Sequence, residues 1–359
     1  MKSFLVSQNE AGQRLDKLLS KYMDTAPKSF FYKMLRKKNI TLNGKKADGS
    51  EKVAEGDEIR LFLSDETIAG FQSGKKSETV SDKKEHVQIP LLKEHEIVFE
   101  GKHLLIANKA AGELSQMAKK EDISINERIV EYLKVTQKIG LDSFTPGVCN
   151  RLDRNTTGLI IAGKSLAGLQ EAAQLLKQRT LHKYYLCIVA GKADKPEYLT
   201  GFLKKEEETN TVTVVSETEF KKLNLNPKEY DRIETELIPL LTNGGVTLAA
   251  IQLITGKTHQ IRAHLASIGL PLLGDTKYGG ERVSRLNREL HLRYQLLHAY
   301  LLQFPKLSGA LSEVSEKIIT AELPAKFART AEELFGKEEY KNAIMEFTRS
   351  SRFRTGGTD

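Results

Sequence analysis

Short runs of alternating apolar and polar residues recur along most of this chain and limit the folds it can adopt. Examples between residues 89 and 320 are HLLIANK, GLIIAGK, KYYLCIVAG, VTLAAIQLI and LLHAYLLQF. Alternation with period two is typical of strands covered on one face, which favours antiparallel pairing. Helical spacing is rarer and falls at about 123–137, 165–178, 258–268 and 325–347. Strands that outnumber helices without alternating with them predict an α+β fold with a mixed, mainly antiparallel sheet.

The first 64 residues carry a pattern of their own. Two stretches with helical spacing lie within residues 11–35, and Pro27 between them suits the first turn of a second helix. ITLNGKK then leads a strand into Asn43-Gly44, which is a strong hairpin signal, and GDEIRLFL alternates as a strand does. We therefore expect a small α+β domain over residues 1–64.

The composition changes twice after this unit. Residues 65–88 are polar and rich in Ser, Lys and Gly, which predicts a flexible linker. The strand-rich region then predicts a second, larger domain over residues 89–347. The polar end of the chain predicts a disordered tail over residues 348–359.

The charge of the chain favours a polyanionic partner. The formal net charge is +8, and residues 1–63 hold 13 Lys and Arg against 8 Asp and Glu. Such an excess in a small domain predicts contacts with nucleic-acid phosphates. The candidate side chains for this role are Arg14, Lys17, Lys28, Lys33, Arg36, Lys37 and Lys38.

Other classes of protein are disfavoured. No apolar stretch approaches the roughly 18–20 residues of a membrane span, and the N-terminus has no apolar signal region. Cys149 and Cys187 have neither metal-ligand nor disulfide spacing, which fits a reducing cytoplasm. There is no dinucleotide fingerprint, phosphate-binding loop, HExxH or CxxC, so we expect no cofactor and no metal.

An aspartate between two arginines stands in the segment NRLDRNTTG, residues 150–158, directly before an apolar strand. A carboxylate between cations stays ionised and is a competent nucleophile. The same residues also fit an exposed loop whose ion pairs contribute little to stability. The residues alone leave both interpretations open, with Asp153 as the candidate catalytic group.

Two further segments offer partners for this carboxylate. In LITGKTHQIRAHLASIG, Thr258 is expected to cap a helix on which Arg262 lies off the apolar stripe. An arginine held on a helix can clamp a carboxylate, although a solvated arginine fits the pattern too. On the strand KYYLCIVAG, Tyr185 points to the same side as Cys187, either into a cleft or into the core.

Together these segments resemble the RluA-type pseudouridine synthases, which isomerise uridine in ribosomal and transfer RNA. NRLDRNTTG is similar to the family's His-Arg-Leu-Asp-x-x-Thr-Ser-Gly motif, KYY to its Lys-x-Tyr strand, and TGKTHQIR to its Thr-Gly-Arg-Thr-His-Gln-Ile-Arg motif. GDTKYG and LLHA follow in the family's order. Asn150, Thr157 and Lys257 depart from the usual His, Ser and Arg. The first 60 residues resemble the small αL RNA-binding domain known from a ribosomal small-subunit protein.

The resemblance implies that residues 89–347 are a pseudouridine synthase catalytic domain, and it implies roles for particular residues. Asp153 is implied as nucleophile or general catalyst, Arg262 as its ion-pair partner and Tyr185 as the side chain packed on the target base. The residues implied at the flipped-out nucleotide are Arg151, which intrudes into the stack, Leu152, Thr157 and His259. The implied partner is structured RNA, with 23S ribosomal RNA favoured over transfer RNA by the N-terminal domain, and the default oligomeric state is a monomer.

Two other functions remain open. A non-catalytic RNA-binding or ribosome-assembly factor on the same fold would share the charge and the N-terminal domain. It would not require Asp153, Tyr185 and Arg262 together. A glycosidase needs a second carboxylate, and we interpret the only candidate by motif, Asp275, as structural. No Gly-x-Ser-x-Gly elbow points to a triad hydrolase.

Overall fold

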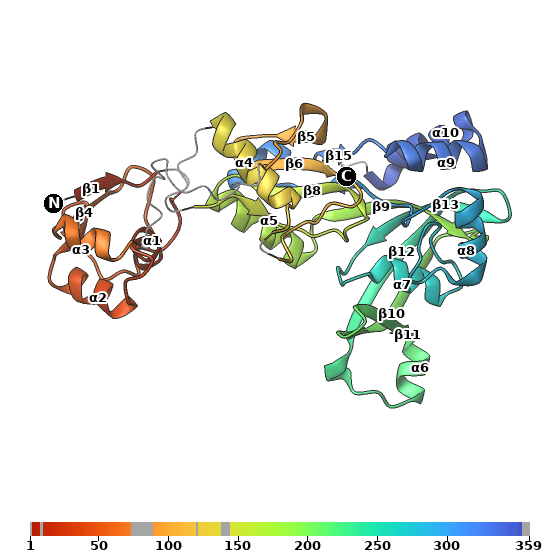
Figure 1. The fold of residues 1–359 in the computed structure, drawn as a ribbon, viewed down its shortest axis with the longest axis horizontal. Coiled ribbons are helices and arrows are strands. Elements are labelled where there is room, and N and C mark those ends of the chain that lie inside the picture. The colour runs from red at the N-terminus through yellow and green to blue at the C-terminus, as the bar shows by residue number, and fades with distance from the viewer. Residues whose placement is uncertain (1, 8–9, 73–88, 120, 138–143, 354–359) are drawn as a thin grey trace, which may run out of the picture.

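Two separate β-sheets organise the chain in the computed structural model, which describes residues 2–7, 10–72, 89–119, 121–137 and 144–353. The first has the strand order β1-β4-β2-β3. The second has 11 strands in the order β11-β10-β12-β13-β9-β14-β8-β6-β5, with β15 paired to β14 and β7 paired to β8 (Figure 1). The β14–β8 pair is parallel, and the other pairs of these described strands are antiparallel. The predicted α+β class with a mixed, mainly antiparallel sheet is confirmed.

The N-terminal sheet packs on two helices. Its elements are β1 (Lys2–Leu5), α1 (Leu15–Tyr22), α2 (Lys28–Arg36), β2 (Ile40–Leu42), β3 (Lys45–Lys46) and β4 (Glu58–Leu61). Pro27 stands at the N-cap of α2, and the apolar faces of both helices bury Leu15, Leu18 and Phe31 against the sheet. The sequence patterns do not predict β1, because a short edge strand with mostly exposed side chains shows no apolar alternation.

The structure corrects the first part of the predicted linker at residues 65–88. Residues Asp65–Gly70 form the helix α3, and the Ser64 hydroxyl caps it by accepting the Thr67 N–H. Ile68 is buried against the core of the N-terminal sheet and Phe71 packs on Phe30, so two apolar contacts and a cap order a segment of polar composition. Residues 73–88 of the predicted linker lie outside the described residues.

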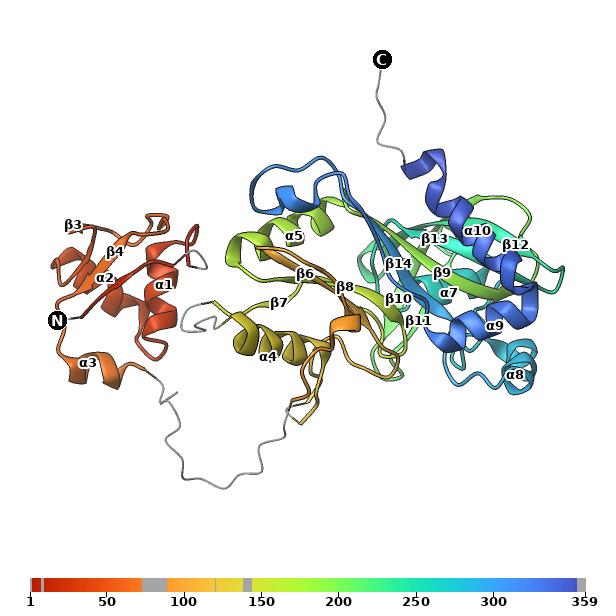
Figure 2. The same cartoon turned by 90° about the horizontal axis from the view of Figure 1, so that it is seen from above.

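The large sheet carries the remaining elements. Its strands are β5 (Ile97–Glu100), β6 (Leu104–Lys109), β7 (Gly147–Val148), β8 (Thr157–Gly163), β9 (His182–Ala190), β10 (Glu197–Glu206), β11 (Thr211–Val215), β12 (Asp231–Thr242), β13 (Val246–Leu253), β14 (Leu297–Gln303) and β15 (Ile318–Thr320). The α-helices are α4 (Ile125–Gln137), α5 (Leu166–Gln178), α6 (Glu217–Lys222), α7 (Gln260–Ser267), α8 (Gly280–Glu289), α9 (Ala325–Phe335) and α10 (Lys337–Arg349). Figure 2 shows α4 and α5 beside β6 and β8, and α9 and α10 beside β12 and β13.

Helices cover both faces of the central strands. On β9, Tyr185 and Cys187 pack with residues of α7, while Tyr184 and Leu186 pack with residues of α8, α9 and α10. The alternation read from the sequence for this strand is therefore confirmed. It separates two layers of core, and the layer that contains Tyr185 also contains Leu152, the neighbour of Asp153.

A glycine allows the parallel strands β8 and β14 to meet beside the segment that contains Asp153. Gly158 has φ +108°, a conformation that L side chains rarely adopt. A Cβ at this position would stand 2.2 Å from the Ala299 carbonyl oxygen, so a side chain does not fit. Gly158 thus fixes where the chain enters β8 directly after Asp153 and Thr157.

The C-terminal segment is more ordered than the sequence predicts. The helical pattern over 325–347 is divided into α9 and α10 at Gly336, whose φ is +88°. Helix α10 continues to Arg349, and Phe353 is buried with its ring 5.0 Å from that of Tyr184. The predicted disordered tail 348–359 is therefore wrong for residues 348–353, because the buried Phe353 and the ion pair of Arg352 with Glu236 anchor a polar segment. Residues 354–359 lie outside the described residues.

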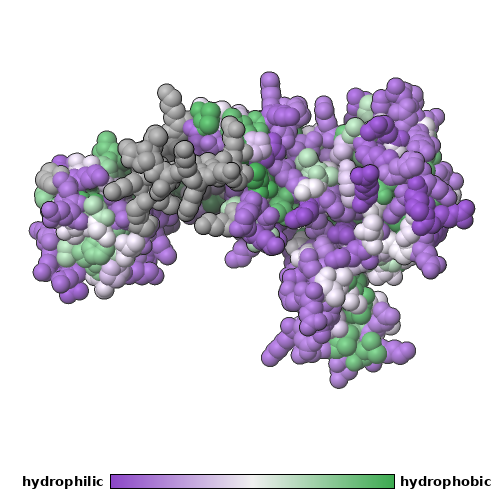
Figure 3. All heavy atoms as spheres, viewed as in Figure 1, coloured by the Kyte–Doolittle hydropathy of each residue, from purple (hydrophilic) through white to green (hydrophobic). Residues whose placement is uncertain are grey.

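The surface agrees with the composition. Hydrophilic side chains predominate on the face seen in Figure 3, and apolar areas are smaller and separate. Across the described ranges, no helix combines the length and apolar character that crossing a bilayer requires.

Candidate active site

Asp153 lies in the loop between β7 and β8, and hydrogen bonds along β8 shape that loop. The Asn150 side-chain oxygen accepts the Ile161 N–H at 2.7 Å, and its amide donates to the Leu159 carbonyl at 3.3 Å. The Thr156 N–H donates to the Asp153 carbonyl at 3.0 Å and closes the turn. Asn150, which departs from the family's usual His, therefore acts here on the backbone of the neighbouring strand.

The peptide groups on both sides of Asp153 are held by the side chains of Lys109, the last residue of β6, and Ser115, which follows that strand. The hydroxyl of Ser115, a buried residue, accepts the Leu152 N–H at 2.9 Å and donates to the Leu152 carbonyl at 2.8 Å. The Lys109 ammonium donates to the Arg154 carbonyl at 3.0 Å. Since Leu152 and Arg154 flank Asp153, these bonds fix the direction in which its carboxylate leaves the backbone.

Lys109 is a buried cation at the end of β6. Its ammonium also donates to the carbonyls of Ala110 and Glu113, at 2.9 and 2.8 Å, so three acceptors satisfy its three N–H groups. Burial lowers the pKa of Lys109 to about 8, against the opposing effect of the Glu113 and Asp153 carboxylates. Sequence analysis missed Lys109 and Ser115. A lysine inside the apolar run HLLIANK is the signal that marks Lys109, and Ser115 has none.

Arg262 on α7 joins two carboxylates. Its Nη1 donates to Asp153 Oδ2 at 3.1 Å, and its Nε and Nη2 donate to the two oxygens of Asp275 at 2.7 and 3.0 Å. The structure thus brings Arg262 to Asp153, but the bidentate clamp expected from the sequence is made with Asp275. Only one oxygen of Asp153 is used: Oδ1 makes no hydrogen bond with a residue in the described ranges.

Asp275 stabilises the charged form of this cluster. Its side chain is fully buried, and it also accepts the N–H groups of Lys277 and Tyr278 at 2.9 and 3.1 Å. Burial alone would raise the pKa of Asp275, but Arg262 and these N–H donors hold that pKa below its usual value. Burial opposes the charge on Arg262 as well, and the two carboxylates raise the pKa of Arg262. Asp275 is therefore structural, as the sequence suggested, through a contact with Arg262 that the sequence did not predict.

His259 lies beside Asp153 in its neutral form. Its Nε2 is 3.9 Å from Asp153 Oδ2, and its Nδ1 is 2.9 Å from the Tyr278 hydroxyl. Burial lowers the pKa of His259, with Asp153 opposing and Arg262 adding to the effect. The Tyr278 hydroxyl also accepts the Val212 N–H at 3.0 Å, which ties this wall of the site to β11.

The predicted cap of α7 is wrong. The N-cap residue is His259, with φ +52° and no side-chain cap bond, and Thr258 is exposed. The Gln260 side chain orders the preceding loop instead: its oxygen accepts from the Thr255 hydroxyl at 2.9 Å and from the Lys257 N–H at 3.1 Å. The buried Gln260 amide, and not the predicted Thr258 hydroxyl, thus orders the chain at the start of α7.

The remaining candidates divide into two groups. Tyr185 is 6% exposed, and burial, aided by the Asp153 charge, raises the pKa of its hydroxyl, so it is neutral. Leu152 is buried in the same layer, and Arg151 is exposed. Thr157 differs: its buried hydroxyl lies 2.8 Å from His298 Nδ1 in the sheet, so the structure does not bring it to the open side of Asp153.

The basic residues of the N-terminal unit are mostly available for contacts. Arg14 forms an ion pair with Asp16 at 3.0 Å. The other candidates are exposed and make no ion pair with a residue of the described ranges: Lys17, Lys28, Lys33, Arg36, Lys37 and Lys38.

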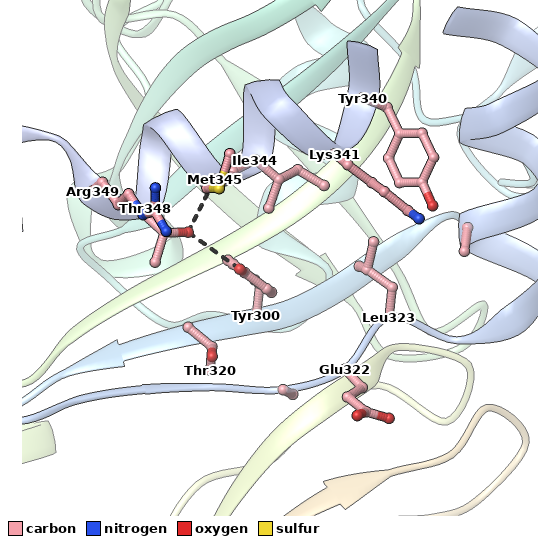
Figure 4. Close-up of a pocket in the computed structure, with 12 residues that line it drawn as sticks. Tyr300, Thr320, Glu322, Leu323, Tyr340, Lys341, Ile344, Met345, Thr348 and Arg349 are labelled. Atoms are coloured by element: carbon pink, nitrogen blue, oxygen red, sulfur yellow. Dashed lines mark hydrogen bonds between the residues drawn. The ribbon is translucent and has the colours of Figure 1, made fainter. Parts of the chain in front are cut away.

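A groove that contains none of the candidate site residues lies between α10 and the segment that follows β15 (Figure 4). Its volume is about 490 Å³. Tyr300 is hydrogen-bonded to Thr348 in this groove, and Lys341 lies at its edge. In the ranges that the structure describes, no group of three or more His, Cys, Asp or Glu side chains is arranged to hold a metal ion.

The contact of Asp153 with the buried Arg262 is the one that the resemblance to RNA pseudouridine synthases predicts, and comparisons with known proteins identify the chain with this class of RNA-modifying isomerase. A family model described as RNA pseudouridylate synthase matches residues 103–267. An uncharacterized RNA pseudouridine synthase of Mycoplasma genitalium is 31% identical over 85% of this chain and 89% of its own length. The ribosomal large subunit pseudouridine synthase C of Vibrio cholerae is 27% identical over 83% and 87%. The human RNA pseudouridylate synthase domain containing 4 superposes with a TM-score of 0.51 at 22% identity, over 66% of this chain and 92% of its own.

The chain belongs to the RluA-type family of RNA pseudouridine synthases. It is an isomerase whose substrate is RNA. The resemblance read from these motifs is confirmed, and so is the enzymatic function.

Proposed function

We propose that this synthase modifies uridines of 23S ribosomal RNA with Asp153 as its catalytic carboxylate. The observation that carries the proposal is the state of the Asp153 carboxylate: Arg262 donates to its Oδ2, its Oδ1 makes no hydrogen bond with a described residue, and its charge acts on the buried Tyr185. The names of the Vibrio relatives, which refer to the large ribosomal subunit, support the choice of RNA. An enzyme with this substrate works in the cytoplasm.

The reaction needs a fixed anion and little water. The bond from ribose C1′ to N1 of uracil breaks, the base turns, and C5 bonds to C1′. The proton on C5 leaves and N1 takes up a proton, so the product is an isomer of uridine. A carboxylate stabilises the positive character that develops at C1′ or bonds to the substrate covalently. With a side chain 25% exposed, Asp153 is accessible to a substrate yet largely surrounded by protein. Exclusion of water by the bound nucleotide would suppress hydrolysis.

The target base must leave its stack before it reaches Asp153. Unstacking costs on the order of a few kcal/mol. In this proposal Arg151, which is exposed and two residues from Asp153, fills the gap in the stack, and the Tyr185 ring packs on the base. Leu152 and His259 complete the walls around this nucleotide.

The RNA assignment is tested by mapping pseudouridines in total RNA from cells that lack this gene. We expect specific pseudouridines of 23S RNA to disappear and to return when the gene is restored. Loss of pseudouridine from transfer RNA alone would reject the ribosomal target. An unchanged map together with a purified protein that releases no tritium from [5-³H]uridine-labelled RNA would favour the alternative, an RNA-binding or ribosome-assembly factor.

The N-terminal residues 1–64 are proposed as an RNA-binding domain that supplies affinity without chemistry. In the full chain, replacement of Lys33, Arg36 and Lys37 by Gln is expected to weaken binding of a 23S transcript. Each lost phosphate contact should reduce the slope of log affinity against log salt by about 0.7–0.9. Filter binding between 50 and 300 mM salt measures this slope. An unchanged slope, with Lys341→Gln as the control, would reject the role.

A further inference from the structure

Lys183, the first residue of the Lys-x-Tyr motif, is not used by the chemistry described above. It lies on β9 two residues before Tyr185, so both side chains leave the same face of the strand about 7 Å apart. Its ammonium nitrogen is 3.7 Å from the position that a Cβ of Gly256 would take. His259, three residues after Gly256, lies beside Asp153. One short loop therefore connects the surroundings of Lys183 with the catalytic carboxylate.

The charge of Lys183 is not neutralised within the described part of the chain. It is partly buried, and no carboxylate or other hydrogen-bond partner from the described residues meets its ammonium. Burial lowers the pKa of Lys183, and the neighbouring cation Arg179 adds to this effect. Arg179 is exposed directly after α5 and also makes no ion pair with a described residue. Lys257, beside Gly256, differs because it pairs with Asp231 at 2.6 Å.

Two neighbouring cations without an acid are costly for the free protein. A charge that is partly withdrawn from water loses hydration, and a second positive charge nearby adds repulsion. Both costs are removed when a ligand supplies negative charge. The substrate of this enzyme is a polyanion with one phosphate for every nucleotide. A nucleotide whose base packs on Tyr185 carries its own phosphates close to Lys183 and Arg179.

We propose that Lys183, assisted by Arg179, binds a backbone phosphodiester of the RNA strand that carries the target uridine. The contact fixes the register of the strand relative to Asp153 and reads no sequence. It rests on the proposed function only in placing the target base at Tyr185 and Asp153. A lysine acts here as a point charge, so arginine can replace it.

The test compares Lys183→Gln and Lys183→Arg with the wild type on a 23S transcript labelled with [5-³H]uridine. For Lys183→Gln we expect KM to rise about 10-fold with kcat within twofold, because ground-state binding is lost. The slope of log affinity against log salt should fall by about 0.7–0.9. Lys183→Arg should retain the wild-type KM and the wild-type salt slope. Lys341→Gln, which removes a lysine from α10 on the other face of the sheet, should change neither.

Several results would overturn the proposal. An unchanged KM and salt slope in Lys183→Gln would show that no phosphate is bound there. An equal rise of KM in Lys183→Arg and Lys183→Gln would show that the packing of the lysine side chain matters and its charge does not. Thermal unfolding checks the fold, and loss of an unpaired cation should not lower the midpoint. Failure of the proposed function is distinguishable, since a wild type that releases no tritium rejects it while the salt slope still tests Lys183.

Discussion

Replacement of Asp153 by asparagine is expected to lower kcat for tritium release at least about 10³-fold while the affinity for RNA changes by less than threefold. The amide has the same shape as the carboxylate, and its oxygen can still accept the Arg262 N–H. In the wild type, Arg262 Nη1 lies 3.1 Å from Asp153 Oδ2. It has no negative charge to stabilise C1′ and is a poor nucleophile. Single-turnover release from labelled 23S transcript measures the rate, and filter binding measures the affinity.

A matched control is Asp194→Asn. This aspartate is exposed and pairs with Lys192 at 2.9 Å, so its replacement removes the same charge from the chain without touching the site. Both rate and affinity should remain at wild-type values. Release by Asp153→Asn at more than about a tenth of the wild-type rate would remove Asp153 from the chemistry. Equal loss in the control would assign the effect to net charge.

The sequence was sufficient for the fold class because strand alternation and helix spacing are local signals. The two faces of β9, the hairpin at Asn43-Gly44 and the helix start at Pro27 all follow from such patterns. The errors share a different cause. Helix α3 and the segment 348–353 are polar stretches ordered by a few tertiary contacts, those of Ile68 and Phe71 and those of Arg352 and Phe353. Isolated side chains produce no periodicity, so their tertiary partners decide whether the segment is ordered.

The candidate site shows the same division. Asp153, Arg262 and Tyr185 belong to recognisable motifs, and the structure brings them together. Ser115 acts on backbone groups 37 residues away in sequence. The contact between Asp275 and Arg262 depends on how the loop after α7 returns to the sheet. Such contacts are decided by the fold and leave no characteristic spacing in the sequence. For this reason the residues that hold Asp153 and Arg262 in place were missed or incompletely assigned.

Replacement of Asp275 by asparagine is expected to lower the free energy of unfolding by about 3–5 kcal/mol, because Arg262 would stay buried without its main counter-charge. The guanidinium would then be positioned by Asp153 alone, and we expect kcat to fall about 10²-fold through misplacement of Arg262. Urea unfolding followed by circular dichroism measures the first effect, and tritium release measures the second. Asp231→Asn, which breaks only the exposed pair with Lys257, should cost less than about 1 kcal/mol.

The effect of Asp275→Asn on the unfolding free energy should depend on pH in a definite direction. The pKa of Asp275 is lowered in the folded protein, so the unfolded chain binds the proton more readily. The stabilisation by Asp275 is therefore complete above the unfolded pKa of about 4 and is lost as the pH falls through the lower folded value. The difference in unfolding free energy between wild type and Asp275→Asn should be constant from pH 5 to 7 and shrink below about pH 4. A difference that stays the same or grows on acidification would show that the Asp275 carboxylate does not stabilise Arg262.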